Sequence, residues 1–154
     1  MNFIPHPGPQ DKQGYHWLPA KDGDPRALAL YQRHYSCSNF APRNRQFMPP
    51  GEKMVLLTVD CAAVFGWLKN RVERYDHQVG VCCTLFRNEG SILSSQLVRE
   101  ADEIADERWP GERHFTYVDA KKVRSTNPGA CFKLANWRHI GFSKGGLHLL
   151  ERLP

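Results

Sequence analysis

The chain has 154 residues, of which 41% are hydrophobic and 24% are charged, values typical of one ordinary globular domain. Its apolar runs fall short of the roughly 20 residues of a membrane span, and no secretory signal opens the chain, so we expect a cytoplasmic protein that makes no membrane contact. The net charge of +5 is compatible with a polyanionic partner such as DNA but does not require one.

The first segment, residues 1–23, is rich in proline and glycine and has no apolar period, which predicts an extended N-terminal arm. Residues 24–154 are expected to form a single domain. Asp24-Pro25 predicts the start of a helix, because Asp is a good N-cap and proline suits the first helical position. This helix is expected to end near Tyr35, and residues 36–53 are predicted to form a basic loop.

The middle of the chain alternates between strand and helix signals. Residues 54–59 and 79–86 are apolar runs that predict buried strands, whereas 62–72 fits either a strand or a helix. A strong helix is predicted after Gly90, with one apolar and one charged face. The apolar face consists of Leu93, Leu97, Ala101, Ile104 and Ala105, and the charged face of Arg99, Glu100, Asp102, Glu103, Asp106 and Glu107.

The last third predicts a strand, a helix and a hairpin. Residues 113–119 read as a strand, and Asn127-Pro128 predicts a helix start like that at Asp24-Pro25. Two short strands, 137–142 and 147–153, are expected to form a hairpin around the turn 143–146. The order of elements favours an α/β fold with a mixed sheet flanked by helices.

Two segments resemble the GNAT (Gcn5-related N-acetyltransferase) superfamily. Arg87-Asn-Glu-Gly90, between a strand and a long helix, is similar to the GNAT phosphate-binding loop, in which glycine admits the phosphates and helix N–H groups attract them. Residues 127–137 followed by a hairpin resemble the GNAT C-terminal signature. The resemblance implies a GNAT-like mixed sheet in which the helix 91–108 starts at a splayed pair of strands, with a cleft beside Gly90.

The GNAT resemblance also implies a donor site at this loop. A conventional coenzyme A loop has a second small residue where this chain has Ile92, so the implied donor is acetyl-CoA or another acyl donor. The residues that the resemblance places in the cofactor-binding loop are Arg87, Asn88, Gly90, Ser91, Ser94 and Ser95.

A narrower resemblance is to the Mom-type DNA-modification proteins of phages. It rests on His34-Tyr35-Ser36, on Ser94-Ser95-Gln-Leu97, on Asp119 at a strand end and on Ala135-Asn136-Trp137. It implies transfer of a small acyl-type or carbamoylmethyl group to a base in duplex DNA, or acylation of an amine on an already hypermodified base.

This narrower resemblance implies the catalytic residues His34, Tyr35 and Asp119. An imidazole with a pKa near 6.5 can act as general base, with Tyr35 orienting or donating, while a strand-end carboxylate can act as base or bind an exocyclic amine. The alternatives are structural: His34-Tyr35 as the end of an amphipathic helix, and Asp119 as the cap of the turn that follows it. Tyr117, on the same face as Asp119, fits a core position or an acid.

Several of the other candidate residues also have a structural alternative. The alternative for Arg87 is one half of a surface salt bridge, and the alternative for Ser94 and Ser95 is that of ordinary residues in a first helical turn. Asn136 and Trp137 fit the end of a helix with Trp137 as a hydrophobic anchor.

DNA binding is expected from cations on two segments that flank the open end of the sheet. Together with aromatic residues such as Phe40 and Phe47, they suit a groove that follows the nucleic-acid backbone around a flipped base. The candidate DNA-binding residues are Arg43, Arg45, Lys121, Lys122, Arg124 and Asn136.

Disulfides and metal sites are not expected. The five cysteines are odd in number and form no C-x-x-C pair, and the seven histidines show no metal-ligand spacing. Three functions remain: a Mom-type transferase acting on DNA, a conventional acetyl-CoA-dependent N-acetyltransferase of a small amine, and a non-catalytic DNA-binding module on the same fold.

Overall fold

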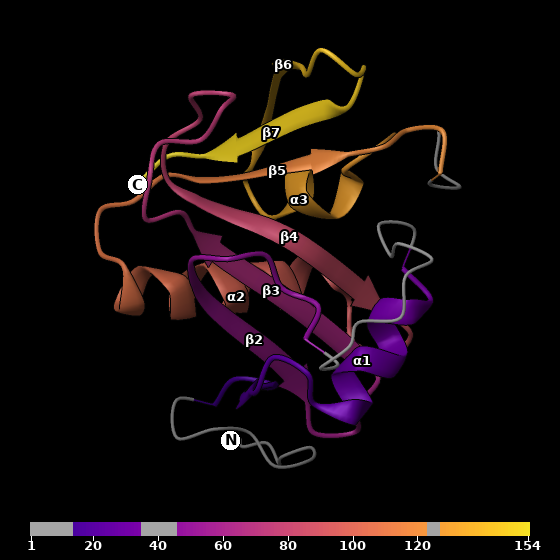
Figure 1. Cartoon of the computed structure of the whole chain (residues 1–154). Helices are drawn as coiled ribbons and strands as arrows, with labels where there is room; N and C mark the ends of the chain where they lie inside the picture. The colour runs from indigo at the N-terminus through magenta and orange to yellow at the C-terminus, as the bar shows by residue number, and fades with distance from the viewer. Residues whose placement is uncertain (1–13, 35–45, 123–126) are drawn as a thin grey trace.

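The computed structural model describes residues 14–34, 46–122 and 127–154, and these contain seven strands and three helices (Figure 1). The strands are β1 (Trp17–Ala20), β2 (Glu52–Thr58), β3 (Ala63–Lys69), β4 (Val81–Asn88), β5 (His114–Val118), β6 (Arg138–Phe142) and β7 (His148–Arg152). The helices are α1 (Pro25–Gln32), α2 (Ser94–Arg108) and α3 (Ala130–Leu134).

The strands form one mixed sheet in the order β1-β2-β3-β4-β5-β7-β6. All neighbours are antiparallel except β4 and β5, which are parallel and joined through α2. A parallel pair needs such a crossover because the chain must return to the end where the first strand began. The predicted fold class, a mixed sheet flanked by helices with a C-terminal hairpin, is confirmed.

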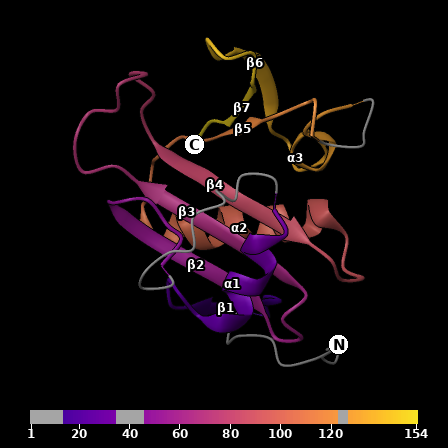
Figure 2. The same cartoon turned by 45° about the vertical axis from the view of Figure 1, so that its right-hand side comes forward.

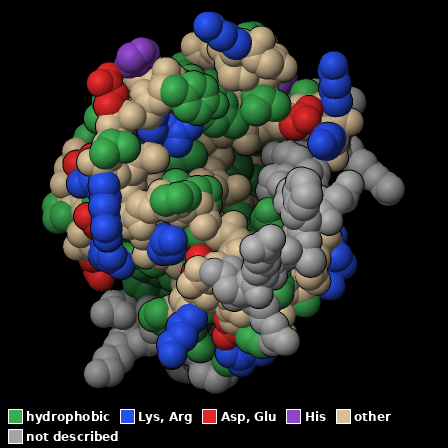
Figure 3. All heavy atoms as spheres, viewed as in Figure 1, with side chains coloured by type: hydrophobic (Ala, Val, Ile, Leu, Met, Phe, Trp, Pro, Cys, Tyr) green, Lys and Arg blue, Asp and Glu red, His purple; other side chains and the backbone are tan. Residues whose placement is uncertain are grey.

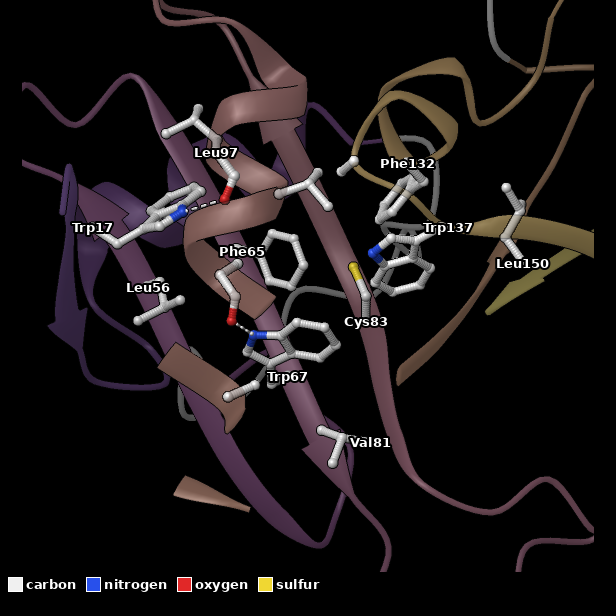
Figure 4. Close-up of a cluster of buried hydrophobic side chains, with 14 of the residues drawn as sticks. Trp17, Leu56, Phe65, Trp67, Val81, Cys83, Leu97, Phe132, Trp137 and Leu150 are labelled. Carbon is white, nitrogen blue, oxygen red and sulfur yellow. Dashed lines mark hydrogen bonds between the residues drawn. The ribbon is translucent and has the colours of Figure 1, made fainter. Parts of the chain in front are cut away.

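The two longer helices, α1 and α2, cover opposite faces of the sheet (Figures 1 and 2). On the α2 face the indoles of Trp17 and Trp67 are fully buried and donate to backbone carbonyls of α2, those of Leu97 at 2.8 Å and Ala101 at 3.1 Å (Figure 4). These bonds satisfy buried indole N–H groups that would otherwise be costly. Within the described residues, no helix has the length and apolar character of a membrane span.

The first helix starts as the sequence predicts. The Asp24 carboxylate accepts a hydrogen bond from the Arg26 backbone N–H, and Pro25 occupies the first helical position. The segment predicted to be an extended N-terminal arm contains a strand, because residues 17–20 form β1 at the edge of the sheet. Burial of Trp17 fixes this strand, and Pro19 is tolerated because an edge strand has only one neighbour.

The predicted charged face of α2 is wrong at two positions. Glu100 and Asp102 are 8% and 2% exposed, whereas Leu93, expected on the apolar face, precedes the helix and is 72% exposed. Glu100 accepts from the backbone N–H of His16 at 2.6 Å, and its second oxygen lies 2.8 Å from the His16 ring. The helix therefore buries carboxylates where histidines from other elements meet them.

The second carboxylate, Asp102, lies at the centre of what we call the α2 seam: Asp102, Asp106, His114, Trp137 and Arg152. Asp102 is 2.7 Å from Nδ1 of the fully buried His114, and it accepts from the Trp137 indole at 2.8 Å. Arg152 pairs with Asp106 at 2.9 Å. Among the described residues His114 Nε2 has no hydrogen-bond partner, whereas His114 Nδ1, Asp102 and the Trp137 indole bind one another inside an otherwise apolar layer.

The third helix is shorter than the sequence predicts. It begins at Ala130, because Gly129 adopts the left-handed conformation (φ 75°) in a turn closed by the Ala130 N–H and the Asn127 carbonyl. A side chain at Gly129 would also bring its Cβ within 2.9 Å of Leu150. The cap predicted at Asn127-Pro128 therefore forms a turn before the helix.

A β-bulge at Thr84 divides β4 into two parts. Cys83 pairs with Trp67 and Leu85 with Gly66, so Thr84 is an extra residue. Residues two apart on a regular strand share a face, but here Cys83 packs on the α2 side and Leu85 on the α1 side. Only the first part of β4, as far as Cys83, pairs with β5, and beyond it the two strands splay apart (Figure 1).

Candidate functional site

A cavity of about 270 Å³ lies between the splayed ends of β4 and β5, and we call it the slot. Its walls are Cys83–Phe86 of β4, Thr116–Val118 at the end of β5 and the start of α3, and His34 after α1 lies at its edge. Figure 4 shows Cys83 of β4 beside Phe132 and Trp137. The slot is therefore mainly apolar, and one side is formed by a strand segment that β5 leaves unpaired.

A wider cavity of about 600 Å³, which we call the basin, continues from the slot. The two share His34, Cys83, Thr84 and Tyr117. The polar side chains of the basin include Asn70, Arg74, Asp119 and Lys122. The face of the molecule seen in Figure 3 is hollowed between hydrophobic side chains. The splay thus joins a narrow apolar cavity to a broad polar one.

The first predicted catalytic residue, His34, lies where the slot meets the basin, two residues after α1. Burial and the nearby Arg87 cation lower the pKa of its ring to about 4, although a hydrogen bond with the Phe86 backbone acts in the opposite direction. The imidazole is therefore neutral at neutral pH. It can accept a proton but is a weaker base than an unperturbed histidine.

The structure brings a second predicted catalytic residue, Asp119, to the same basin. Its carboxylate accepts from the Lys121 backbone N–H at 3.0 Å, so it also caps the turn after β5, as the structural alternative expects. Lys121 and Lys122 are exposed on that turn, and Lys122 borders the basin. His34 thus shares one cavity with Asp119 and Lys122, which lie on a turn far from it in the sequence.

Two residues of the predicted phosphate loop, Arg87 and Glu89, form a salt bridge with each other. Arg87 donates to Glu89 at 2.6 Å, and Glu89 also pairs with Arg33 at 2.7 Å, so the salt-bridge alternative for Arg87 applies. Arg33 and Arg87 lower the pKa of Glu89 to about 2. Two cations and one anion leave this triad with one excess positive charge, which still favours an anion nearby.

The expected cleft beside Gly90 is wrong, because the hollow there has no room for a water molecule. Glycine is required here by packing, since a Cβ would lie 2.9 Å from the Cβ of Ala62. The Gly90 N–H donates to Asn88 Oδ1 at 2.9 Å. Asn88 also donates through Nδ2 to the Ile92 carbonyl at 2.7 Å and to Ser94 Oγ at 3.0 Å. Asn88 therefore organises the loop.

The start of α2 retains the character of an anion site. Its N-cap is Leu93, which supplies no side-chain acceptor to the first turn, where Ser94 and Ser95 are half-buried. The first N–H groups of a helix have no intrahelical partner, and the helix dipole adds positive potential there. Ser91 is exposed on the loop before the helix.

The backbone conformation at position 136 explains why asparagine is found there. It has φ 72° directly after the C-terminal end of α3, a conformation that asparagine tolerates better than most residues. Trp137, next in the chain, is buried in the α2 seam, as the structural alternative expects. The predictions for Tyr35, Arg43, Arg45 and Arg124 lie outside the described residues.

Sequence analysis missed Thr84 and left Tyr117 open between a core position and an acid, yet both residues line the two cavities. Thr84 occupies the bulge, and no local pattern marks a bulge in an apolar run. Tyr117 lines both the slot and the basin, and its hydroxyl donates to Asp76 at 2.7 Å. Burial and this hydrogen bond raise the pKa of Tyr117 to about 12, so its hydroxyl keeps its proton.

The thiols near the slot are poorly suited to nucleophilic catalysis. Burial raises the pKa of Cys131 to about 11 and that of Cys83 well above its usual value. Since the thiolate is the reactive form, neither thiol is activated. Among the described residues, no group of three or more His, Cys, Asp or Glu side chains is placed to hold a metal ion.

Searches for relatives among protein families, curated proteins and solved structures gave no match. The site is therefore interpreted from its own geometry.

Proposed function

We propose that the protein is a GNAT-like transferase that adds a small acyl or carbamoylmethyl group to a DNA base, either unmodified or already hypermodified. The observation that carries this proposal is the junction between the slot and the basin at His34, Thr84 and Tyr117. A transferase must bring a donor and an acceptor together at one point. Two cavities of different width and polarity that share a wall provide such a meeting place.

On the donor side, the slot suits the acyl end of a donor such as acetyl-CoA. Its volume of about 270 Å³ is too small for a whole nucleotide-containing donor, so phosphates would lie outside it. Asn88, two residues after the slot residue Phe86 on β4, donates to Ser94 Oγ at the start of α2 at 3.0 Å. The uncapped first turn of α2 and the excess charge of the Arg33–Glu89–Arg87 triad would attract those phosphates.

On the acceptor side, the basin suits a base turned out of the duplex. Its volume of about 600 Å³ accommodates a nucleoside, and Lys122 at its border can meet a phosphate. Chemistry on a base requires such extrusion, because the target atom is otherwise stacked. Asp119 can accept a hydrogen bond from an exocyclic amine.

The transfer itself would be direct for an acyl group. The acceptor nitrogen forms a bond to the donor carbonyl carbon, and the bond between that carbon and the leaving group breaks. The neutral His34 imidazole takes the proton lost by the nitrogen and passes it to the leaving group, which departs with the bonding electron pair. The high pKa values of Cys83 and Cys131 favour this route over one through a cysteine intermediate.

The test is nucleoside mass spectrometry of DNA from expressing cells and of purified DNA incubated with acetyl-CoA. His34→Ala and Asp119→Ala should each lower product at least a hundredfold, yet keep salt-sensitive DNA binding. Lys122→Ala should weaken DNA binding, whereas Lys21→Ala, an exposed lysine between β1 and α1, is the matched control. Product at wild-type levels from both His34→Ala and Asp119→Ala would exclude the proposed chemistry.

The same experiment separates the two alternatives. Tight binding of coenzyme A and acetylation of a small amine, without DNA binding, would favour a conventional N-acetyltransferase. DNA binding without any transferred group would favour a non-catalytic DNA-binding module.

A further inference from the structure

A third cavity, which we call the groove, adjoins the basin. It has a volume of about 610 Å³ and lies between residues 74–78 of the β3–β4 loop and residues 142–147 at the β6–β7 turn. The loop and the hairpin both project from the upper part of the molecule in Figures 1 and 2. The groove and the basin share Arg74, Tyr117 and Leu147, so a ligand can extend from one into the other.

Aromatic rings stand on both walls of the groove. Tyr75, on the loop, is 92% exposed, and Phe142, on the hairpin, is 63% exposed. The Phe142 ring packs edge-on against His139 and His148, with centroid distances of 5.1 and 4.8 Å. Phe142 is thus held in place although it is open to solvent, and a large exposed ring in a concave surface is typical of a binding site.

The charges of the groove favour a polyanion. Its floor is internally neutralised, because Arg74 pairs with Asp76 at 2.8 Å and Asp76 accepts from Tyr117. Lys144 in the groove and Lys122 at the adjoining basin make no ion pair within the described residues. Uncompensated lysines beside exposed rings are the combination that binds single-stranded nucleic acid, in which bases stack and phosphates meet cations.

We propose that the groove binds unpaired nucleotides adjacent to the acceptor base, with bases stacked on Tyr75 and Phe142 and a phosphate at Lys144. This inference rests on the proposed function for the identity of the base in the basin. It adds that the protein holds a short stretch of opened strand rather than one flipped nucleotide. Stacking accepts any base, so this part of the contact is expected to be independent of sequence.

The experiment measures fluorescence anisotropy of a labelled single-stranded oligothymidine and of a duplex of the same length at two salt concentrations. The double variant Tyr75→Ala/Phe142→Ala, which removes two stacking rings, should bind the single strand at least roughly thirtyfold more weakly than the wild type. Tyr75→Phe/Phe142→Tyr keeps both rings and should retain the affinity. Lys144→Ala should reduce the salt dependence by about one phosphate contact.

A matched control is Val72→Ala, since Val72 is 77% exposed on the same loop and does not line the groove. Its affinity for the oligothymidine should equal that of the wild type. Equal affinity of Tyr75→Ala/Phe142→Ala and the wild type overturns the stacking groove and leaves the transfer chemistry standing. Ring-dependent binding without any transferred group overturns the transferase and leaves the groove. A wild type that binds neither oligonucleotide overturns the assignment to nucleic acid.

Discussion

The α2 seam and the basin contain similar residues in different environments. Each contains a histidine and an aspartate brought together by the fold: His114 and Asp102 in the seam, His34 and Asp119 at the basin. In the seam the two side chains bind each other at 2.7 Å inside the core. At the basin they face a cavity, and each is held by a backbone group instead. Residue types alone therefore do not separate a pair that is closed inside the core from one that faces a cavity; the difference is whether the two side chains already bind each other.

The comparison predicts that the side chains of the α2 seam contribute more to the free energy of unfolding than those of the basin. Asp102→Ala leaves the buried N–H of Trp137 and the His114 ring without their acceptor, and we expect the free energy of unfolding to fall by about 3–5 kcal/mol. Urea denaturation monitored by tryptophan fluorescence measures this change.

The matched control for the seam is Glu103→Ala on the same helix, where the side chain is exposed, and it should change stability by no more than about 0.5 kcal/mol. Asp102→Asn preserves size and serves if the alanine variant does not fold. If Asp102→Asn and Glu103→Ala are equally stable, the seam has no special role.

The second prediction concerns pH and His34. Its folded pKa of about 4 lies below the unfolded value near 6.5, so the unfolded chain binds more protons between these limits. This contribution to stability is complete above pH 6.5 and is lost as the pH falls towards 4. After allowance for solvent screening, the loss is on the order of 1–2 kcal/mol.

This second prediction is measured as the difference in unfolding free energy between pH 7 and pH 5, for the wild type and for His34→Gln. The variant should lose the His34 part of the pH dependence. Arg87→Ala should raise the pKa of His34 in an NMR titration, because the Arg87 cation helps to lower it. An unchanged pH dependence in His34→Gln would mean that the ring is as solvated in the folded protein as in the unfolded chain.

The fold was largely predictable because its signals are local. Asp24-Pro25 marks a helix start through contacts within two residues, and the run 79–86 marks β4 by composition alone. The edge strand β1 was missed because proline and glycine around Trp17 resemble a loop, and only burial against α2 fixes it. Where a long-range contact decides the structure, the local pattern fails.

The candidate site was less predictable for the same reason. Glu100 and Asp102 look like surface charges of an amphipathic helix, and their partners His16 and His114 come from other elements. The grouping of His34 with Asp119 at one cavity followed a resemblance between motifs, whereas the bulge at Thr84 that shapes the cavity has no sequence signal. Motifs indicated which residues to consider, and the fold determined their environment.

The smallest expected effect tests whether Asn136 serves to end α3 or to bind DNA. If its role is to end α3 in the left-handed conformation, Asn136→Gly should leave stability within about 0.5 kcal/mol, because glycine adopts φ 72° without strain. Asn136→Ala should lower the free energy of unfolding by about 1 kcal/mol, since alanine lacks the polar side chain that lets asparagine tolerate that conformation. Urea denaturation gives both values, and DNA affinity is measured on the same proteins. A DNA-binding role would instead appear as a loss of affinity in both variants, including the stable Asn136→Gly. We expect Asn136→Gly to bind DNA like the wild type, which would place Asn136 with the scaffold.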